Sequence, residues 1–399
     1  MKKILFAPPY ITSKEIRLVK KVLKSGWVTT GPMVMSFESL LKDYVQAERV
    51  LCLSSATAGL ELVLRLYGVG EGDEVITTPY TFTATAAVAI HVGAKPVLVD
   101  IGDDFNISPD KIYDAITEKT KAIIPVDFGG KPCDYDRIFS VVNSKSYLFK
   151  PKNSFQESLG RPLIIGDAAH SFGSIYKSKK VGTLADFTVF SFHAVKNITT
   201  AEGGAITIKS FNGFKADEIY KRLKIMSLHG QSKDAFIKGE ENKWFYSILE
   251  AGYKYNMTDI QAAIGIAQLS KYENMLKKRR EIFNSYNREF ASINEKVILP
   301  ELDTTDTMGN AHLYPLRLKK QEIRDDFINY MFKNNIQCNV HFIPLPLHPL
   351  YKNLGYKIED YPVAHINFLR EVSLPIYPHL SYTDFKIIVK NVLNFFKKF

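Results

Sequence analysis

The stretch Pro162-Leu-Ile-Ile-Gly-Asp167-Ala-Ala-His170 is a continuous apolar run that ends in a carboxylate and a histidine. A second apolar run, Phe187-Thr-Val-Phe-Ser-Phe192, is followed closely by Lys196. Near-continuous apolar strands are typical of a parallel sheet that is covered on both faces. Open α/β sheets bind ligands at the carboxyl ends of their strands. The polar residues that follow these two runs are therefore the first candidates for a functional site.

Outward from these runs, apolar segments alternate with helical periodicity. Seven segments are predicted as strands, at 49–53, 74–77, 95–99, 120–126, 162–166, 187–192 and 205–208, and helices such as 58–66 and 82–91 lie between them. Before the first strand, Thr12 and Glu15 form a capping-box pattern for a helix that ends near Gly26, and a second helix is predicted around 35–44. The alternation predicts an α/β fold with a mostly parallel, doubly covered central sheet.

The last third of the chain has a different pattern. Thr258 and Gln261 form another capping box, and one long helix is predicted from there towards Arg280. Beyond it, strands at 312–318 and 337–342 mix with helices at 324–334 and 383–396. We therefore predict an N-terminal arm and large domain over residues 1–270, and a smaller α+β domain over residues 271–399.

Composition and charge exclude several classes of protein. The 399 residues are 46% hydrophobic and 24% charged, which excludes a disordered or fibrous chain. The net charge of +10 is spread along the sequence, which argues against a nucleic-acid face and is compatible with an anionic small substrate. Three distant cysteines without metal-ligand spacing predict a cytoplasmic protein without a metal site, and no apolar run is long enough for a membrane span.

The polar residues at the strand ends have a specific chemical use when they are taken together. A lysine whose pKa is lowered forms Schiff bases with carbonyl groups, as Lys196 would do. Pyridoxal phosphate (PLP) needs such a lysine and a carboxylate for its pyridine nitrogen, a role open to Asp167. Its phosphate needs a helix N-terminus, which the run Ser55-Ala56-Thr57 supplies, and Phe82 can cover the ring face. Taken singly, these residues are more often a surface lysine, helix caps and a core aromatic.

Several long segments, in the same order, resemble one known family. They are SGWVTTGP (25–32), GDEVITTPYTF (72–82), GDAAHSFG (166–173), SFHAVKN (191–197), MTDIQAAIG (257–265) and VHFIP (340–344). The chain resembles the DegT/DnrJ/EryC1/StrS sugar aminotransferases nearly from end to end. The resemblance implies PLP as the cofactor. It also implies the PLP-dependent transferase fold type I (aspartate-aminotransferase-like), with a mostly parallel central sheet and a smaller α+β C-terminal domain.

The resemblance assigns a role to each candidate residue. Lys196 forms the Schiff base with the cofactor and then shuttles protons, with His193 beside it in the catalytic group. The residues that the resemblance implies around the cofactor are Asp167, His170, Ser191, Phe82, Ser55, Ala56, Thr57, Lys254 and Asn256. Thr29, Thr30 and His341 are implied on the substrate side, and a homodimer with shared active sites is implied. Two residues depart from the common family pattern, because Lys254 stands where many relatives have Asn and Ala56 where Gly is commoner.

The implied reaction transfers an amino group from L-glutamate to a nucleotide-linked keto sugar, with 2-oxoglutarate as the second product. Ala194 in the Ser191–Lys196 block, together with the GWVTTGP segment, most resembles relatives that aminate C4 of the sugar. The alternatives are a C3 aminotransferase, a PLP-dependent dehydratase on the same fold, and a non-catalytic nucleotide-sugar-binding protein. One branch of the family has His at the lysine position and performs dehydration, so Lys196 argues against that branch.

Overall fold

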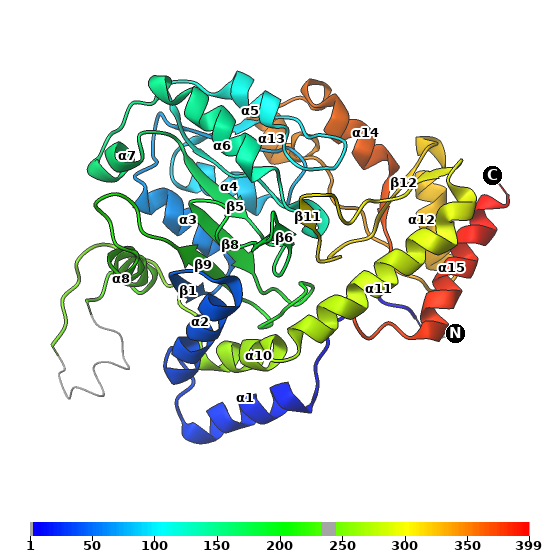
Figure 1. Ribbon diagram of the computed structural model, residues 1–399, viewed down its shortest axis with the longest axis horizontal. Helices are drawn as coiled ribbons and strands as arrows, with labels where there is room; N and C mark the ends of the chain where they lie inside the picture. Colours follow the sequence, from blue (N-terminus) through cyan, green and yellow to red (C-terminus); the bar gives the residue numbers. More distant parts are fainter. Residues whose placement is uncertain (1–2, 233–244, 399) are drawn as a thin grey trace.

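One seven-stranded sheet forms the centre of the larger lobe in the computed structural model, which describes residues 3–232 and 245–398. Its order is β1-β9-β8-β5-β4-β2-β3 (Figure 1). The strands are β1 (Arg49–Leu53), β2 (Glu74–Thr77), β3 (Lys95–Leu98), β4 (Thr120–Ile123), β5 (Leu163–Asp167), β8 (Phe187–Ser191) and β9 (Gly204–Ile208). Six of the seven strands run in the same direction and β9 runs opposite to them, so the predicted mostly parallel sheet is confirmed.

Helices cover both faces of this sheet. In β5, Leu163 and Ile165 belong to one hydrophobic cluster and Ile164 to another, because successive side chains of a strand point to opposite faces. The first cluster contains residues of α3 (Ala56–Leu66), α4 (Ala84–His91), α7 (Ser154–Leu159) and α8 (Ala216–Ser227), and the second contains residues of α5 (Pro109–Ala115) and α6 (Tyr135–Ser144). This arrangement leaves the strand ends as the open edge of the sheet.

The N-terminal helices lie along the lower edge of the large lobe in Figure 1. They are α1 (Ser13–Ser25) and α2 (Pro32–Val45), and both contact α10 (Asp259–Leu269). The predicted capping box is present, since the Thr12 N–H donates to Glu15 at 2.7 Å. Gly26 ends α1 with a positive φ of 75°, a conformation that glycine adopts without strain.

The single helix predicted from Thr258 towards Arg280 is wrong. The chain breaks after α10 and continues as α11 (Tyr272–Phe290), which crosses to the smaller lobe (Figure 1). At the break, Lys271 leaves the helical region with φ −124°. Its ammonium group pairs with the buried carboxylate of Glu15 at 2.6 Å and donates to the Tyr10 carbonyl at 3.0 Å. These tertiary contacts with the N-terminal segment accompany the turn in the chain.

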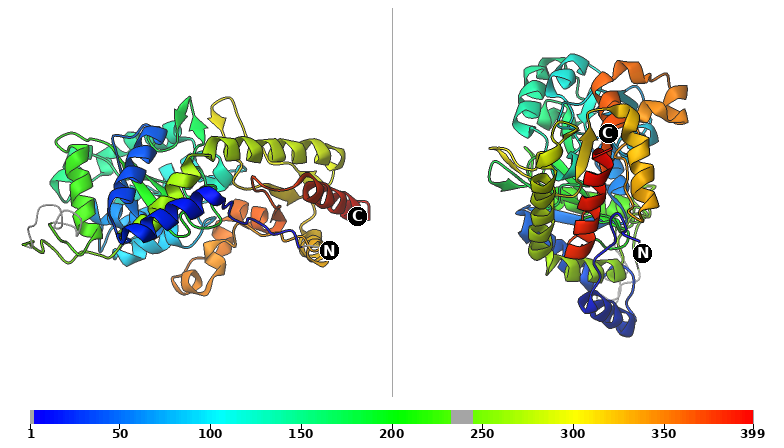
Figure 2. Two further views of the ribbon diagram at one scale, coloured as in Figure 1. Left: turned by 90° about the horizontal axis from the view of Figure 1, so that it is seen from below. Right: turned by 90° about the vertical axis from the view of Figure 1, so that its right-hand side faces the viewer.

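The smaller lobe is built on a three-stranded antiparallel sheet of β10 (Val297–Ile298), β12 (Pro315–Leu318) and β13 (Glu371–Ser373). Its core includes residues of α11, α12 (Arg324–Lys333) and α15 (Tyr382–Phe396), and α13 (Pro349–Asn353) and α14 (Pro362–Arg370) connect α12 to β13. Ile4 belongs to the same core and forms a bridge to Ile336, so both ends of the described chain lie at this lobe (Figure 2).

The strand predicted at 337–342 is also wrong. Its backbone makes one isolated bridge, between Asn339 and Ser373. The N–H groups of the next two residues donate to side chains instead of a neighbouring strand: Val340 to the Asn339 amide oxygen and His341 to the Glu371 carboxyl. Side-chain acceptors that compete for backbone donors in this way interrupt a β-ladder.

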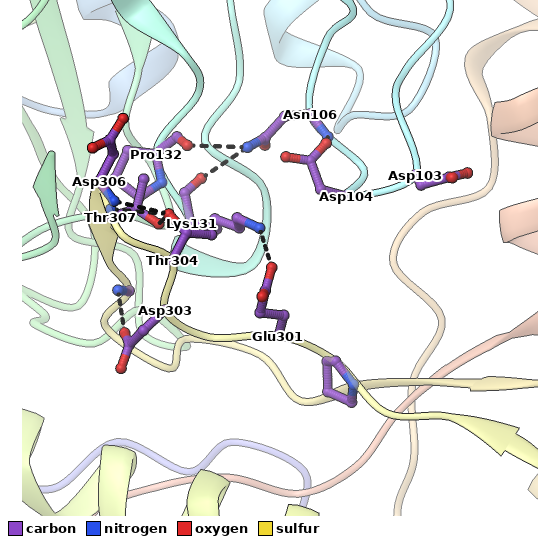
Figure 3. Close-up of polar contacts among 12 residues, drawn as sticks. Asp103, Asp104, Asn106, Lys131, Pro132, Glu301, Asp303, Thr304, Asp306 and Thr307 are labelled. Atoms are coloured by element: carbon purple, nitrogen blue, oxygen red, sulfur yellow. Dashed lines mark hydrogen bonds and ion pairs between the residues drawn. The ribbon is translucent and has the colours of Figure 1, made fainter. Parts of the chain in front are cut away.

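Residues of both lobes line a cleft, and Figure 3 shows polar contacts among residues in and around it. We call it the acidic cleft; it has a volume of about 220 Å³, and its charged lining residues are Asp103, Asp104, Lys131, Glu301 and Arg317. The Lys131 ammonium group lies 3.2 Å from Glu301 across it. Below the cleft, β11 (Thr307–Met308) joins β6 (Ile175–Tyr176) and β7 (Lys179–Lys180) in a small third sheet.

Among residues 3–232 and 245–398, no helix is both long enough and apolar enough to cross a bilayer. The His, Cys, Asp and Glu side chains of these residues form no group suited to a metal ion. Cys52, Cys133 and Cys338 are free thiols.

Candidate active site

A cavity of about 480 Å³ opens at the carboxyl ends of β5 and β8. Ten of the predicted site residues line it: Ser55, Ala56, Thr57, Phe82, Asp167, His170, Ser191, His193, Lys196 and His341. These residues lie up to almost 290 positions apart in the sequence. Most of them follow β1, β2, β5 or β8, and parallel strands bring their carboxyl ends to one edge of the sheet. His341 reaches the same cavity from the smaller lobe. We call this space the cofactor cavity.

Lys196 follows β8 in a turn that the His193 carbonyl closes by accepting its N–H at 2.9 Å. Burial lowers the pKa of its amine to about 8, and the nearby Asp167 carboxylate opposes part of that shift. About a tenth of the amine is therefore unprotonated at pH 7, far more than for an ordinary lysine, and the unprotonated form is the nucleophile. His193 is exposed, with its Nε2 3.6 Å from Glu202.

Asp167 ends β5 and is buried. One carboxylate oxygen accepts the Thr85 hydroxyl at 2.8 Å and the other accepts the Ala169 N–H at 3.2 Å. Burial raises the pKa of this carboxyl, while the two hydrogen bonds lower it. A protonated ring nitrogen placed here would relieve the cost of burying the charge. Thr85 was not predicted, because a threonine in the first turn of a helix carries no signal of its own.

Two buried imidazoles lie against each other with their planes tilted by 45°. The rings of His170 and His312 are 4.3 Å apart, and His170 Nδ1 accepts the Gly129 N–H at 3.3 Å. Burial and the charge of Lys196 lower the pKa of His170 well below its ordinary value. His170 is therefore neutral with its proton on Nε2, where it can donate to an oxygen. His312, which bonds to the Asn197 amide at 2.9 Å, was not among the predicted residues, since it lies in none of the segments that carry the family resemblance.

The far end of the cavity is a helix N-terminus. Ser55 caps α3 by accepting the Ala58 N–H at 3.1 Å, and the N–H groups of Ala56 and Thr57 precede the first intrahelical bonds. Strand β9 passes so close that a Cβ on Gly204 would lie 2.5 Å from the Ala56 nitrogen. Glycine at 204 thus keeps this cradle open. Helix N-termini of this kind bind phosphate.

The residues present fit PLP. A lysine amine, a buried carboxylate and a helix N-terminus surround one cavity, and they match the aldehyde, the pyridine nitrogen and the phosphate of that molecule. Phe82 is 63% exposed at the rim of the cavity, where an aromatic side chain can contact the ring.

Four predicted site residues do not line the cavity within this chain: Thr29, Thr30, Lys254 and Asn256. Asn256 donates to the Thr30 hydroxyl at 2.7 Å, and Thr30 donates to the Met257 carbonyl at 2.6 Å. Thr29 and Lys254 are exposed. Their roles stay predictions that require a second subunit.

Comparisons with known proteins agree on one family. The model of the DegT/DnrJ/EryC1/StrS aminotransferase family matches residues 9–393. The PLP form of a putative sugar aminotransferase, Spr1654 from Streptococcus pneumoniae, is 43% identical with a TM-score of 0.93 and covers 98% of this chain and 97% of its own. The spore coat polysaccharide biosynthesis protein SpsC of Bacillus subtilis is 38% identical, over 98% of this chain and 97% of its own. PseC of Helicobacter pylori, an aminotransferase in pseudoaminic acid biosynthesis, is 28% identical with a TM-score of 0.88 over the whole of both chains.

Proposed function

The chain belongs to the DegT/DnrJ/EryC1/StrS aminotransferase family and is a PLP-dependent sugar aminotransferase, and we propose that it aminates C4 of a nucleotide-linked 4-keto sugar with L-glutamate as the amino donor. In this reaction the amino group of glutamate replaces the carbonyl oxygen of the sugar, and 2-oxoglutarate leaves. The observation that carries the proposal is the meeting of the Lys196 amine and the Asp167 carboxyl at one cavity.

The side chains of this cavity divide the work. PLP, when bound, supplies an aldehyde carbon that condenses with amines and an electron-poor ring that withdraws electrons. Lys196 Nζ would take the proton from the glutamate carbon that bears the amino group and would return it to the carbon that was the aldehyde of the cofactor. Asp167 would bind the protonated ring nitrogen, and the first amides of α3, with the Ser191 hydroxyl, would bind the phosphate. His170 would donate from Nε2 to an oxygen of the cofactor, and Phe82 would exclude water from the ring face.

The substrate proposal rests on charge and on relatives. A sugar nucleotide carries a diphosphate, and the net charge of +10 favours the approach of an anion. SpsC takes part in polysaccharide biosynthesis and PseC in pseudoaminic acid biosynthesis, so we place this enzyme in the synthesis of a surface polysaccharide or glycan in the cytoplasm.

We also propose that two copies of the chain share their active sites. Large apolar side chains are exposed on α1 and α2, namely Ile16, Leu23, Met35 and Leu40. A homodimer that covers them would bring Thr29, Thr30, Lys254 and Asn256 of each subunit to the cavity of the other. Mixed dimers test this: an equal, randomly reassembled mixture of Lys196→Ala and Asn256→Ala subunits should regain about a quarter of the wild-type activity, because about half of the dimers are hybrids and each hybrid has one intact site of two. No recovery on mixing, with hybrids shown by mass, would contradict shared sites.

The substrate test is a panel of UDP- and dTDP-linked 4-keto and 3-keto sugars, each incubated with ¹⁵N-glutamate. We expect a ¹⁵N-labelled product whose NMR spectrum places the nitrogen on C4. Nitrogen on C3 would replace the proposal with C3 amination. Loss of water without nitrogen transfer would replace it with dehydration.

A further inference from the structure

A chain of hydrogen bonds leads from the wall of the cofactor cavity into the smaller lobe. His341 lines the cavity, and its Nδ1 lies 2.9 Å from the Ser373 hydroxyl. That hydroxyl donates to one oxygen of Glu371 at 2.5 Å, and the other oxygen accepts the His341 backbone N–H at 2.8 Å. Glu371 and Ser373 lie on β13, and both are 0% exposed.

The contact between Asn339 and His341 fixes which atom donates in each of these hydrogen bonds. The Asn339 amide oxygen accepts the Val340 N–H at 2.9 Å, so the amide nitrogen of Asn339 faces His341 Nε2 at 3.3 Å. An amide nitrogen only donates, so Nε2 must accept, and the imidazole proton must lie on Nδ1. Nδ1 then donates to Ser373, which leaves the serine proton for Glu371. Every hydrogen bond in this series has one donor and one acceptor only when Glu371 is ionised and accepts the serine proton.

We propose that ionised Glu371, acting through Ser373, is a positioning residue that holds the His341 imidazole with its Nε2 lone pair towards the cavity, to accept a hydrogen bond from a hydroxyl group of the sugar. The hydroxyl takes the place of the long contact with Asn339, which also lines the cavity. The orientation of His341 is a property of this chain alone, and only the identity of its ligand rests on the proposed function.

The protonation state of Glu371 decides the direction of the hydrogen bonds between Glu371, Ser373 and His341. Burial raises the pKa of Glu371 to about 8, against hydrogen bonds from Ser373 and His341 and the charge of Arg324. The charge of Glu371 in turn raises the pKa values of Tyr80 and Cys338. A protonated Glu371 donates to Ser373, which then donates to Nδ1 and moves the imidazole proton to Nε2. The pKa of His341 itself is lowered to about 3, so the ring stays neutral while this happens.

The test is the tautomer of His341, read by ¹⁵N NMR of histidine-labelled, cofactor-free protein, with His341→Gln to assign the signal. At about pH 9.5 we expect the wild type to carry the proton on Nδ1. Glu371→Gln should carry it on Nε2 at the same pH, because the new amide nitrogen donates to Ser373. Asp100→Asn is the matched control: this buried carboxylate accepts the Val363 and Ala364 N–H groups elsewhere, and its loss should leave the His341 signal unchanged.

Two outcomes would overturn the proposal: a wild-type proton on Nε2 at that pH, or the same tautomer in Glu371→Gln and wild type. If Glu371→Gln does not fold, lowering the pH of the wild type through 8 gives the same test, because protonation of Glu371 should move the proton to Nε2. An unchanged tautomer across that range would count against the proposal.

Steady-state kinetics distinguish a positioning role from a purely structural one, because only a positioning role should affect one substrate and not the other. At about pH 9.5, where Glu371 is ionised in the wild type, Glu371→Gln and Ser373→Ala should lower kcat/KM for the UDP- or dTDP-linked keto sugar about tenfold, while the KM for glutamate stays the same. Equal losses for both substrates would contradict the positioning role. If no keto sugar of the panel is aminated by the wild type, the proposed function fails, and the tautomer result still decides the role of Glu371.

Discussion

The cofactor cavity and the acidic cleft lie against each other between the two lobes, and Leu313 lines both. The acidic cleft has five charged side chains in its wall, but both aspartates and Glu301 are exposed. The cofactor cavity has fewer charged groups, and burial shifts the pKa values of its lysine and its aspartate. The difference teaches that burial beside a specific partner, and not the number of charges, prepares a side chain for chemistry.

The largest difference between the two cavities is expected when the lysine of each is replaced by methionine. Lys196→Met removes the amine that binds the cofactor and moves the proton, so kcat should fall by about 10⁴-fold or more. Lys131→Met removes a lysine that only pairs with an exposed glutamate, and kcat should stay within about twofold of the wild type. Steady-state assays with glutamate and the keto sugar measure both. Comparable losses in the two variants would contradict the distinction.

Paired substitutions of the acids give the next largest effect. Asp167→Asn keeps the hydrogen bond from Thr85 but removes the charge that favours a protonated ring nitrogen, so kcat should fall about a hundredfold. Asp104→Asn in the acidic cleft should change kcat little. Single-turnover absorbance changes on mixing with glutamate locate the loss in the first half-reaction. Full activity in Asp167→Asn would show that its charge is not needed.

The cost of burying the Lys196 amine should appear in the pH dependence of the free energy of unfolding. The folded-state pKa of Lys196 is about 8 against an ordinary 10.5, so the folded protein binds fewer protons than the unfolded one between these values. Burial of this amine therefore costs most below pH 8, and the cost disappears above about 10.5. Cofactor-free Lys196→Met should be about 1 to 3 kcal/mol more stable than wild type near pH 7, with the gain lost at high pH. Urea unfolding across the pH range measures it, and a gain independent of pH would point to packing instead.

The smallest effect is expected from the ion pair that crosses the acidic cleft. A double-mutant cycle of Lys131→Ala and Glu301→Ala should give a coupling of about 0.5 kcal/mol or less, because Glu301 is exposed and water screens the pair. Thermal unfolding of the four proteins supplies the cycle. A coupling several times larger would mean that the cleft closes more tightly than its exposure indicates.

Local sequence patterns predicted the sheet and the centre of the site well. The apolar runs that end at Asp167 and near Lys196 stand out because a buried parallel strand has a strong signature, and the capping boxes at Thr12 and Thr258 mark real helix starts. The resemblance then united residues as distant as Ser55 and His341, which the structure places around one cavity.

The parts that sequence patterns missed depend on contacts between distant segments. The break at Lys271 accompanies its pairing with Glu15, and residues 337–342 leave the strand geometry because side chains accept their N–H groups. Thr85 and Glu371 are ordinary helix and strand residues until the fold brings them to Asp167 and His341. Local sequence patterns do not predict such contacts between residues that are distant in the chain.

The most direct measurement of the central claim is borohydride reduction of the purified, PLP-loaded enzyme, followed by peptide mass spectrometry. The account predicts one stable pyridoxyl group per chain, on the peptide that contains Lys196, and its loss after prior incubation with glutamate. A pyridoxyl group on another lysine, or none on a protein that retains full activity, would contradict it.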